Sequence, residues 1–305
     1  MTKLLLVGAS GLLGSEIIAQ APSGSGIEGT YNPNVDGREI RAFHSLDITS
    51  MDEVERIFNR LKPDSVILTA AMSSLEGCEK SPKLAQKVNV IGPENVAICC
   101  KKFGARLMFI SSVYVFDGEK GGRYAEEDVP RPLSVYARTK VEAEAIITSL
   151  LPDPIIIRTA VLYGWTPETE RGNFATMIIR RLRSNESVNV FADQYTSPTF
   201  CGDLANAILE LSEKDFSGLL NVSGPDCMTR SECGSTIAEV FNLDKTLLKS
   251  VSLDSVGFVA RRPKHACLDV SKVERLLGRS MVSFSEGIST MRREEQSSCR
   301  PRSFS

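Results

Sequence analysis

Residues 3–14 read Lys3-Leu4-Leu5-Leu6-Val7-Gly8-Ala9-Ser10-Gly11-Leu12-Leu13-Gly14, and this stretch predicts how the chain begins to fold. The apolar run at 4–7 is typical of a strand buried on both faces of a sheet. In the G-x-x-G-x-x-G spacing that follows, Gly8 permits a tight turn, Gly11 lets backbone approach a pyrophosphate, and Gly14 lets a helix pack closely on the sheet. The N-terminus of that helix offers N–H groups to phosphate. The stretch therefore predicts a strand–turn–helix unit that binds a dinucleotide.

The first half of the chain continues this alternation of strand and helix patterns. It predicts an α/β protein with a doubly wound parallel Rossmann sheet. The expected strands are 3–8, 27–31, 39–43, 65–70, 106–111 and 154–158, and the expected helices are 12–20, 50–61, 82–103 and 134–150. After Gly164 the alternation weakens, and we expect a strand at 188–191 and helices at 172–184, 203–213, 230–241 and about 284–293. The polar residues 296–305 predict a flexible tail.

Composition excludes several classes of function. The chain has 305 residues and a net charge of −2, so it can bury a large core and lacks the basic excess typical of nucleic-acid-binding proteins. No apolar run reaches the roughly 18 residues of a membrane span. The N-terminus enters a strand without the pattern of a signal peptide. We therefore expect a cytoplasmic protein with no nucleic-acid or membrane partner.

Cysteine and histidine usage predicts no metal site. None of the eight cysteines forms a C-x-x-C pair, which favours reduced thiols over a disulfide framework or a zinc site. The only two histidines, His44 and His265, argue against a histidine-based triad. His265 follows a basic run and is a modest candidate for the substrate side.

Tyr136 and Lys140 are the strongest catalytic candidates. They are four residues apart in an expected helix, so they share one face, about 6 Å apart. An ammonium beside a phenol favours the phenolate, so we expect Lys140 to lower the pKa of Tyr136. A tyrosine tuned in this way can transfer a proton near neutral pH. Ser112, upstream at the end of an expected strand, supplies a hydroxyl that can orient a carbonyl oxygen.

Together these motifs resemble the extended short-chain dehydrogenase/reductase family, and within it the dTDP-4-dehydrorhamnose reductases (RmlD-like). Besides the Tyr136/Lys140 pair, three segments carry the resemblance: Phe-Ile-Ser-Ser-Val-Tyr-Val-Phe-Asp-Gly at 109–118, Arg-Thr-Ala-Val-Leu-Tyr-Gly at 158–164 and Arg-Arg-Pro-Lys-His-Ala-Cys-Leu-Asp at 261–269. The resemblance implies a nucleotide-binding domain at 1–164, to which segments near 195–215 and 258–270 return. It also implies a smaller, discontinuous substrate-binding lobe, mainly 165–295, and a homodimer formed by the helices at 82–103 and 134–150.

The cofactor expectation rests on the second strand, which ends Gly29-Thr30-Tyr31-Asn32. An acidic residue near this point bonds the ribose 2′-hydroxyl of NAD, and its absence here favours NADP, with NAD as the alternative. By resemblance, Asp47 and Ile48 meet the adenine, although Asp47 could instead cap the helix at 50–61. Asn89 is expected to bond backbone near the site. The expected cofactor-binding residues are Gly8, Ser10, Gly11, Leu12, Leu13, Gly14, Tyr31, Asn32, Asp47, Ile48, Ala70, Ala71, Met72, Tyr136, Lys140, Thr159 and Val161.

The resemblance implies reduction of the 4-keto group of a nucleotide-activated deoxysugar. Ser112, Tyr136 and Lys140 would be catalytic, with Ser112 donating to the developing oxyanion. The expected substrate-binding residues are Met72, Val113, Tyr114, Asn173, Arg262 and Lys264. The basic run at 261–264 could hold a diphosphate, or it could be a solvated loop. Val113 stands where the family usually has an acidic residue, which argues against a sugar-nucleotide dehydratase and leaves the identity of the sugar open.

Two alternatives use the same motifs. A nucleotide-sugar epimerase has the same triad but returns the hydride, and the segment at 261–269 favours the reductase over it. The regulatory beta subunit of methionine adenosyltransferase shares a nearly identical Ser-Ser-x-Tyr-Val-Phe-Asp-Gly run and binds NADP while serving a partner enzyme. The intact Ser112, Tyr136 and Lys140 do not separate this subunit from a reductase.

Overall fold

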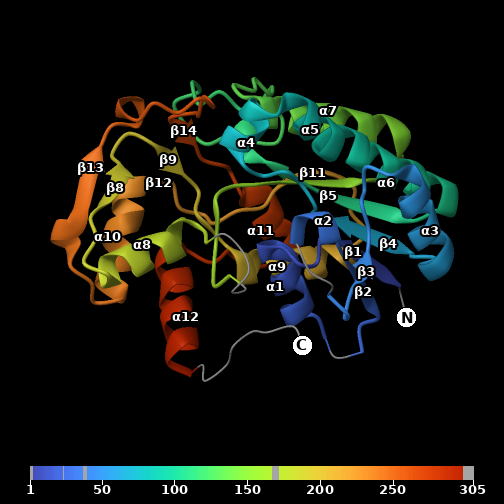
Figure 1. The fold of residues 1–305 in the computed structure, drawn as a ribbon, viewed down its shortest axis with the longest axis horizontal. Helices are drawn as coiled ribbons and strands as arrows, with labels where there is room; N and C mark the ends of the chain where they lie inside the picture. The colour runs from blue at the N-terminus through green and yellow to red at the C-terminus, as the bar shows by residue number, and fades with distance from the viewer. Residues whose placement is uncertain (1–2, 23, 37–39, 167–171, 298–305) are drawn as a thin grey trace.

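Seven parallel strands form one sheet in the right half of Figure 1. The structure is a computed structural model that describes residues 3–22, 24–36, 40–166 and 172–297. The strands are β1 (Leu4–Val7), β2 (Ile27–Tyr31), β3 (His44–Ser45), β4 (Ser65–Leu68), β5 (Arg106–Ser112), β6 (Ile155–Thr159) and β11 (Gly218–Asn221), in the order β11-β6-β5-β4-β1-β2-β3. The order reverses beside β1, so the expected doubly wound parallel sheet is confirmed.

Helices cover both faces of this sheet. On one face lie α1 (Leu12–Gln20), α9 (Cys201–Ser212) and α11 (Ser271–Leu277), and on the other lie α3 (Met51–Leu61), α6 (Gly92–Phe103) and α7 (Val135–Leu150). Successive strand residues point to opposite faces. Accordingly, Leu4 and Leu6 pack in the first layer, while Leu5 and Val7 pack in the second. No helix within the described residues is long and apolar enough to cross a membrane.

The expected helix at 82–103 consists of three consecutive segments. They are α5 (Pro82–Gln86), a π-helical turn η1 (Lys87–Ile91) and α6. A π-turn inserted in a helix often marks a functional site, and this one contains Asn89. Three short α-helices were not predicted, α2 (Pro33–Asp36), α4 (Leu75–Lys80) and α11.

Within the seven-stranded sheet, two strands differ from expectation. The strand predicted at 39–43 is wrong for the residues that the structure describes there, because β3 begins at His44 and has two residues; residue 39 lies outside the described residues. Phe43 instead packs over β2, where a Cβ at Gly29 would lie 2.6 Å from its ring. The second strand, β11, was not predicted, because it is four residues long and begins with an exposed glycine. It joins the sheet beside β6.

The smaller part of the molecule lies at the left of Figure 1. Its core includes the rings of Tyr163 and Phe284, which are 5.0 Å apart. Around this core lie α8 (Phe174–Arg183), β8 (Val188–Phe191), α10 (Arg230–Val240), β13 (Leu248–Val251) and α12 (Phe284–Ser297). Helix α12 continues past the predicted end at 293, and residues 298–305 of the expected tail lie outside the described residues.

A three-stranded sheet of very short strands connects distant segments of the chain. Strand β9 (Tyr195–Thr196) lies between β12 (Met228–Thr229) and β14 (His265–Ala266). Met228 and Ala266 both pair with Thr196, so the neighbouring cysteines at 227 and 267 emerge at the same end of β9. They form a disulfide between residues 40 positions apart. The prediction of reduced thiols is wrong for this pair, because only the fold brings it together.

Candidate active site

Ser112, Tyr136 and Lys140 come together at the carboxyl end of β5. Ser112 is the last residue of β5, and α7 begins just before Tyr136, where the Ser134 hydroxyl caps the helix by accepting a hydrogen bond from the Ala137 amide at 3.2 Å. The Tyr136 hydroxyl is hydrogen-bonded to the side chain of Ser112, and the Lys140 Nζ lies 5.9 Å from the centre of the Tyr136 ring. All three residues are buried. Strand and helix thus place a hydroxyl, a phenol and an amine in one desolvated site.

Lys140 is held from several sides. Its Nζ donates to the Ile110 carbonyl at 2.9 Å and lies 4.7 Å from the centre of the Phe109 ring. Burial lowers the pKa of Lys140 to about 8, and the charge of Glu144 opposes this shift. Glu144 in turn accepts hydrogen bonds from Arg158 Nε at 3.0 Å and Nη2 at 2.7 Å, and one from Ser111. This buried ionic group fixes α7 against β5 and β6.

The pKa of Tyr136 differs from expectation. Burial raises it to about 12, and the hydrogen bond with Ser112 opposes the rise. The expected lowering by Lys140 is not found, because burial dominates and the Lys140 Nζ is directed at the Ile110 carbonyl. A tyrosine with a raised pKa stays protonated at neutral pH, which is the form that can donate a proton.

Asn89 links the catalytic helix to the loop after β4. Its Oδ1 accepts from the Met72 amide at 2.8 Å, while its Nδ2 donates to the Met72 carbonyl at 3.1 Å and to the Thr139 hydroxyl at 3.2 Å. The Thr139 hydroxyl donates to the Tyr136 carbonyl at 2.7 Å. Asn89 thus bonds backbone near the site, and the network sets the position of Met72 relative to Tyr136.

The glycine loop fits a dinucleotide. Gly8 has φ +97°, and a Cβ there would lie 2.7 Å from the Ala70 amide nitrogen, while a Cβ at Gly14 would lie 2.1 Å from the Gly8 carbonyl oxygen. Gly11 caps α1 without a side-chain acceptor, and the first turn of α1 has no acidic residue. At the carboxyl end of β6, the buried Thr159 hydroxyl has no hydrogen-bond partner in the described ranges. The loop leaves room for phosphate at a helix N-terminus, and Thr159 offers a free polar group near the end of β6.

Two of the expected adenine-side residues make local turns. The Asn32 Oδ1 accepts from the Asn34 amide at 3.0 Å, at the start of α2. Asp47 accepts from the amide and the hydroxyl of Thr49 at 2.9 and 2.8 Å. The idea that Asp47 caps the next helix is wrong, since Ser50 caps α3.

The other expected cofactor residues lie at the same edge of the sheet. Asn95 holds the Ile48 backbone by donating to its carbonyl at 2.9 Å. The side chain of Leu13, in α1, packs in the core against the sheet, so only the Leu13 backbone is available to a ligand. The remaining expected cofactor residues are buried Tyr31 and half-buried Ser10, Leu12, Ala70, Ala71 and Val161.

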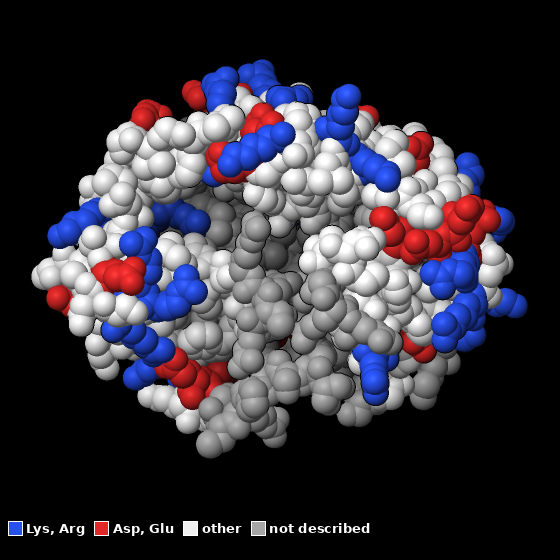
Figure 2. Space-filling model, in the orientation of Figure 1, with Lys and Arg blue, Asp and Glu red and all other residues white. Residues whose placement is uncertain are grey.

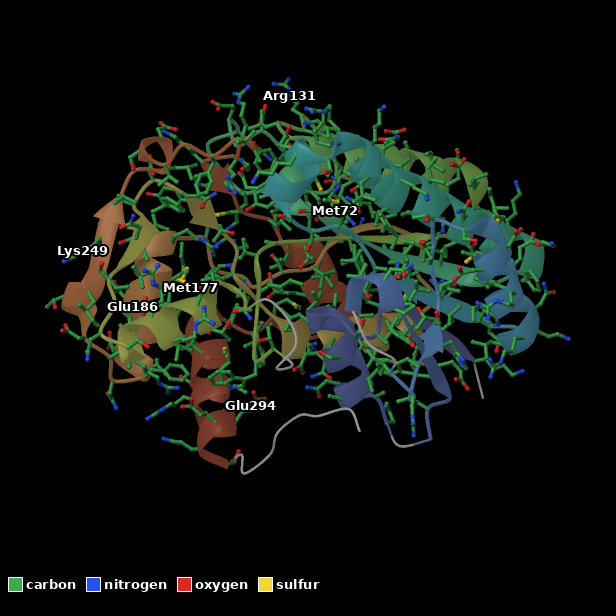
Figure 3. All side chains as sticks on the ribbon, in the orientation of Figure 1. Met72, Arg131, Met177, Glu186, Lys249 and Glu294 are labelled. Atoms are coloured by element: carbon green, nitrogen blue, oxygen red, sulfur yellow. A yellow bond between two sulfur atoms is a disulfide. The ribbon has the colours of Figure 1, made fainter. Side chains whose placement is uncertain are left out.

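The structure places only some of the expected substrate residues beside the catalytic group. Met72 and Tyr114 pack with Tyr136, and the Tyr114 ring meets the Tyr136 ring edge-on with centroids 6.4 Å apart. Figure 3 labels Met72 near the middle of the molecule. Val113 is 1% exposed within a separate apolar cluster, and Asn173 caps α8 by accepting from two amides.

The basic run at 261–264 does not converge on one point. Arg262 donates to Glu76 at 3.0 Å, close to α4. Lys264 is exposed and pairs with Asp193 and Asp254. A contact of Lys264 with substrate would first have to break these two ion pairs.

Arg230 was missed by sequence reasoning. Its Nη1 is buried and finds no hydrogen-bond partner among the described residues, and its guanidinium lies 4.1 Å from the centre of the Phe174 ring. Burial lowers its pKa, and its charge interacts with Tyr114 and Arg262. A buried cation without a counter-ion is costly, so this group is suited to bind an anion. The sequence signal around it, the capping box of Thr229 and Glu232, marks only the start of α10.

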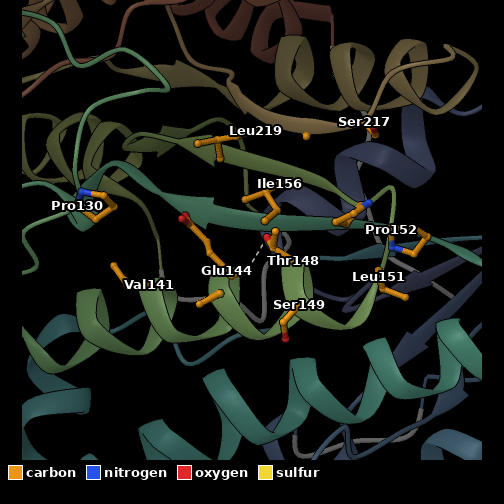
Figure 4. A pocket seen from close by; sticks show the side chains of 13 residues that line it. Pro130, Val141, Glu144, Thr148, Ser149, Leu151, Pro152, Ile156, Ser217 and Leu219 are labelled. Carbon is orange, nitrogen blue, oxygen red and sulfur yellow. Dashed lines mark hydrogen bonds between the residues drawn. The ribbon is translucent and has the colours of Figure 1, made fainter.

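Figure 2 shows a recess on one face of the molecule, between its two halves, with basic side chains at its left wall. A different groove of about 620 Å³ lies between α7 and the β6–β11 edge of the sheet (Figure 4). Glu144, Ile156 and Leu219 line it, and none of the expected site residues does. It is therefore separate from the candidate active site.

A parallel sheet with a glycine loop at β1, and a serine, tyrosine and lysine at β5 and α7, define an extended short-chain dehydrogenase/reductase. The chain belongs to the RmlD substrate binding domain family, which it matches over residues 1–297. The resemblance expected from the motifs is thereby confirmed.

Three similar proteins illustrate the range of the family. A probable low-salt glycan biosynthesis reductase, Agl14, from Haloferax volcanii is 32% identical, covering 94% of this chain and 96% of the relative. The methionine adenosyltransferase 2 subunit beta of Mus musculus is 31% identical, covering 94% and 86%. The dTDP-4-dehydrorhamnose reductase of Bacillus anthracis in complex with NADP superposes with a TM-score of 0.87 at 29% identity, covering 96% of this chain and 100% of that one.

Proposed function

We propose that this protein reduces the 4-keto group of a nucleotide-activated deoxysugar with NADPH. The observation that carries the proposal is the buried group at the end of β5, where the Tyr136 hydroxyl is bonded to Ser112 and Lys140 lies 5.9 Å from the tyrosine ring. Family membership supports the same reaction class, and dTDP-4-dehydrorhamnose is the first substrate to test.

Each residue has a defined part in this reaction. A bound nicotinamide supplies the hydride. Ser112 donates a hydrogen bond to the carbonyl oxygen and fixes its position as negative charge develops there. Tyr136, kept protonated by its raised pKa of about 12, gives its proton to that oxygen. Lys140 adds positive charge beside the phenol, which stabilises the phenolate left behind.

Arg230 supports a phosphate-bearing substrate. Its buried Nη1 lacks a hydrogen-bond partner among the residues that the structure describes, and it neighbours Tyr114, which packs on Tyr136. A diphosphate bound there would supply the missing counter-charge. Arg262, paired with Glu76 in this structure, is the second candidate for the same phosphates.

NADP is the proposed cofactor, with NAD as the alternative. The second strand ends in Tyr31 and Asn32 without a carboxylate to repel a 2′-phosphate. Asn32 is engaged in the turn that starts α2, so the adenosine end would meet a neutral surface at this point. The solved Bacillus anthracis relative binds NADP, which supports the same preference here.

A role as a subunit of another enzyme is the second candidate. The 31% identity with a methionine adenosyltransferase subunit supports this role. The presence of Ser112, Tyr136 and Lys140 does not distinguish such a subunit from a reductase. An epimerase is less well supported, since the family match over residues 1–297 is to RmlD. Copurification of a partner enzyme without ketone reduction would favour the subunit.

We also propose a homodimer. The helix at 82–103 exposes two large apolar side chains, Leu84 at 50% and Ile91 at 39%. They lie on the segment that the family resemblance assigns to the dimer interface. A four-helix contact with the helix at 134–150 of a second copy would bury both.

The test measures NADPH oxidation with dTDP-4-dehydrorhamnose as the loss of absorbance at 340 nm. It compares the wild-type protein with Tyr136→Phe. Removal of the proton donor should lower turnover roughly 10²-fold or more while NADPH affinity is unchanged. Equal turnover in the two proteins would refute the role of Tyr136. Tight NADPH binding without any oxidation would refute this substrate and favour the subunit role.

A further inference from the structure

Three potential metal ligands meet at one end of β9, and none of them is Ser112, Tyr136 or Lys140. They are Cys227, just before β12, His265 of β14 and Cys267, just after β14. Their ligand atoms all lie within 4.8 Å of one another. Within the described residues this is the one cluster of its kind, and the two sulfur atoms are joined as a disulfide in the structure.

The disulfide leaves His265 as the one residue of the cluster that is not bonded to the other two. The Nδ1 atom of His265 is buried and has no hydrogen-bond partner within the part of the chain that the structure describes. Leaving a buried polar atom without a hydrogen bond is unfavourable. A disulfide engages only the two sulfurs, whereas a metal ion would engage both sulfurs and a ring nitrogen of His265.

We propose that Cys227, His265 and Cys267 form a binding site for a divalent cation of the zinc type when the disulfide is reduced. Two thiolates and an imidazole nitrogen are the donor set that zinc prefers. The fourth tetrahedral position is left to water or an added ligand. Two thiol protons are released when the ion binds, since only thiolates act as ligands.

The fold holds two of the three ligands in position. The His265 ring stacks on the Tyr195 ring with centroids 4.9 Å apart. The Cys267 carbonyl accepts from the Tyr124 amide at 2.8 Å, and the next amide, of Leu268, donates to the Ser197 hydroxyl at 3.2 Å. Cys227 and His265 are only half-buried, so an ion can reach the site from solvent.

The site would connect the two segments that carry the substrate-side arginines. Cys227 precedes Arg230 by three residues, and Cys267 follows Arg262 by five residues. An ion bound by both cysteines would restrain both segments, as the disulfide does. The metal site itself does not depend on the proposed reductase activity, and its test does not use turnover.

The experiment is a titration with Co²⁺ alone, which reports thiolate coordination by its absorption. The purified chain is reduced with excess dithiol, which becomes a disulfide as the Cys227–Cys267 bond is broken, and the reductant is then removed without air. Cys299, which lies outside the described residues, is replaced by serine in every sample. The proposal predicts one Co²⁺ per chain, with thiolate charge-transfer and tetrahedral bands, and displacement of the ion by Zn²⁺.

Variants decide which residues bind the ion. His265→Ala, Cys227→Ser and Cys267→Ser should each weaken Co²⁺ binding at least about tenfold, and His265→Gln serves if His265→Ala does not fold. Cys233→Ser, a buried free cysteine of α10, is the matched control and should bind like the parent. Absence of the bands in the reduced parent, or equal bands in the His265 variants or the oxidised protein, would overturn the proposal.

Discussion

The ion pair between Arg158 and Glu144 gives the sharpest stability prediction. Its side chains are 4% and 10% exposed, and the two contacts are 3.0 and 2.7 Å long. Arg158→Met would leave a buried carboxylate whose remaining side-chain hydrogen bond comes from Ser111. Removing one partner of a buried pair costs about 3–5 kcal/mol. Since each 1.36 kcal/mol is a factor of ten, the ratio of folded to unfolded protein should fall by roughly two to four decades.

The control is an arginine–glutamate pair on the surface that is also joined by two hydrogen bonds. Arg183 contacts Glu295 at 2.7 and 2.8 Å, but its side chain is 42% exposed. Arg183→Met should therefore cost no more than about 1 kcal/mol. The two variants keep the same change of side chain and differ in burial.

Urea unfolding measures the loss of unfolding free energy in both variants, provided that the dependence of that free energy on urea concentration is unchanged. The double variant Arg158→Met/Glu144→Gln removes both charges and should recover about 2 kcal/mol relative to the sum of the single variants. The reasoning fails if Arg158→Met loses no more stability than Arg183→Met. It also fails if the two single losses simply add.

Three further predictions concern binding, pH and assembly. Arg230→Met should raise the KM for the nucleotide sugar at least about tenfold with unchanged NADPH affinity; an unchanged KM in initial-rate assays would contradict the phosphate role. Burial lowers the pKa of Lys140 from 10.5 to about 8, so the unfolded chain binds more protons between these values and stability should rise with pH there, by up to about 1.4 kcal/mol per unit. In Lys140→Met, urea midpoints measured across this pH range should lack the part of the rise in stability that Lys140 contributes. An identical rise in the variant would argue against the lowered pKa of Lys140. Leu84→Glu should halve the mass seen by light scattering, and a parent protein that is already monomeric would refute the dimer.

Sequence reasoning succeeded where local pattern and sheet topology decide the outcome. The apolar run at 4–7 and the spacing of Gly8, Gly11 and Gly14 predicted β1 and the start of α1, because a buried parallel strand and a close helix contact leave few alternatives. Strand β2 (Ile27–Tyr31) was predicted with its observed bounds. The four-residue spacing of Tyr136 and Lys140 placed both on α7 because helix periodicity is local.

Sequence reasoning failed where the outcome depends on contacts between distant segments. The Cys227–Cys267 disulfide joins segments that both flank β9, and strands of two residues leave no pattern to read. The pKa of Tyr136 is set by burial, which spacing does not report. The basic run at 261–264 suggested one cluster, but Arg262 and Lys264 pair with different carboxylates.

The two halves of the site therefore differ in what determines them. The proposed proton-transfer group is built on β5 and α7 and is fixed by the buried Arg158–Glu144 pair and by Asn89. The two proposed phosphate contacts come from segments outside the seven-stranded sheet, where Arg230 follows a two-residue strand and Arg262 precedes another. Because these segments are joined by Cys227 and Cys267 rather than by long strands, they can change sequence without disturbing the catalytic group. We therefore expect substrate choice to depend on residues 227–267, and the proposed reaction to depend on Ser112, Tyr136 and Lys140.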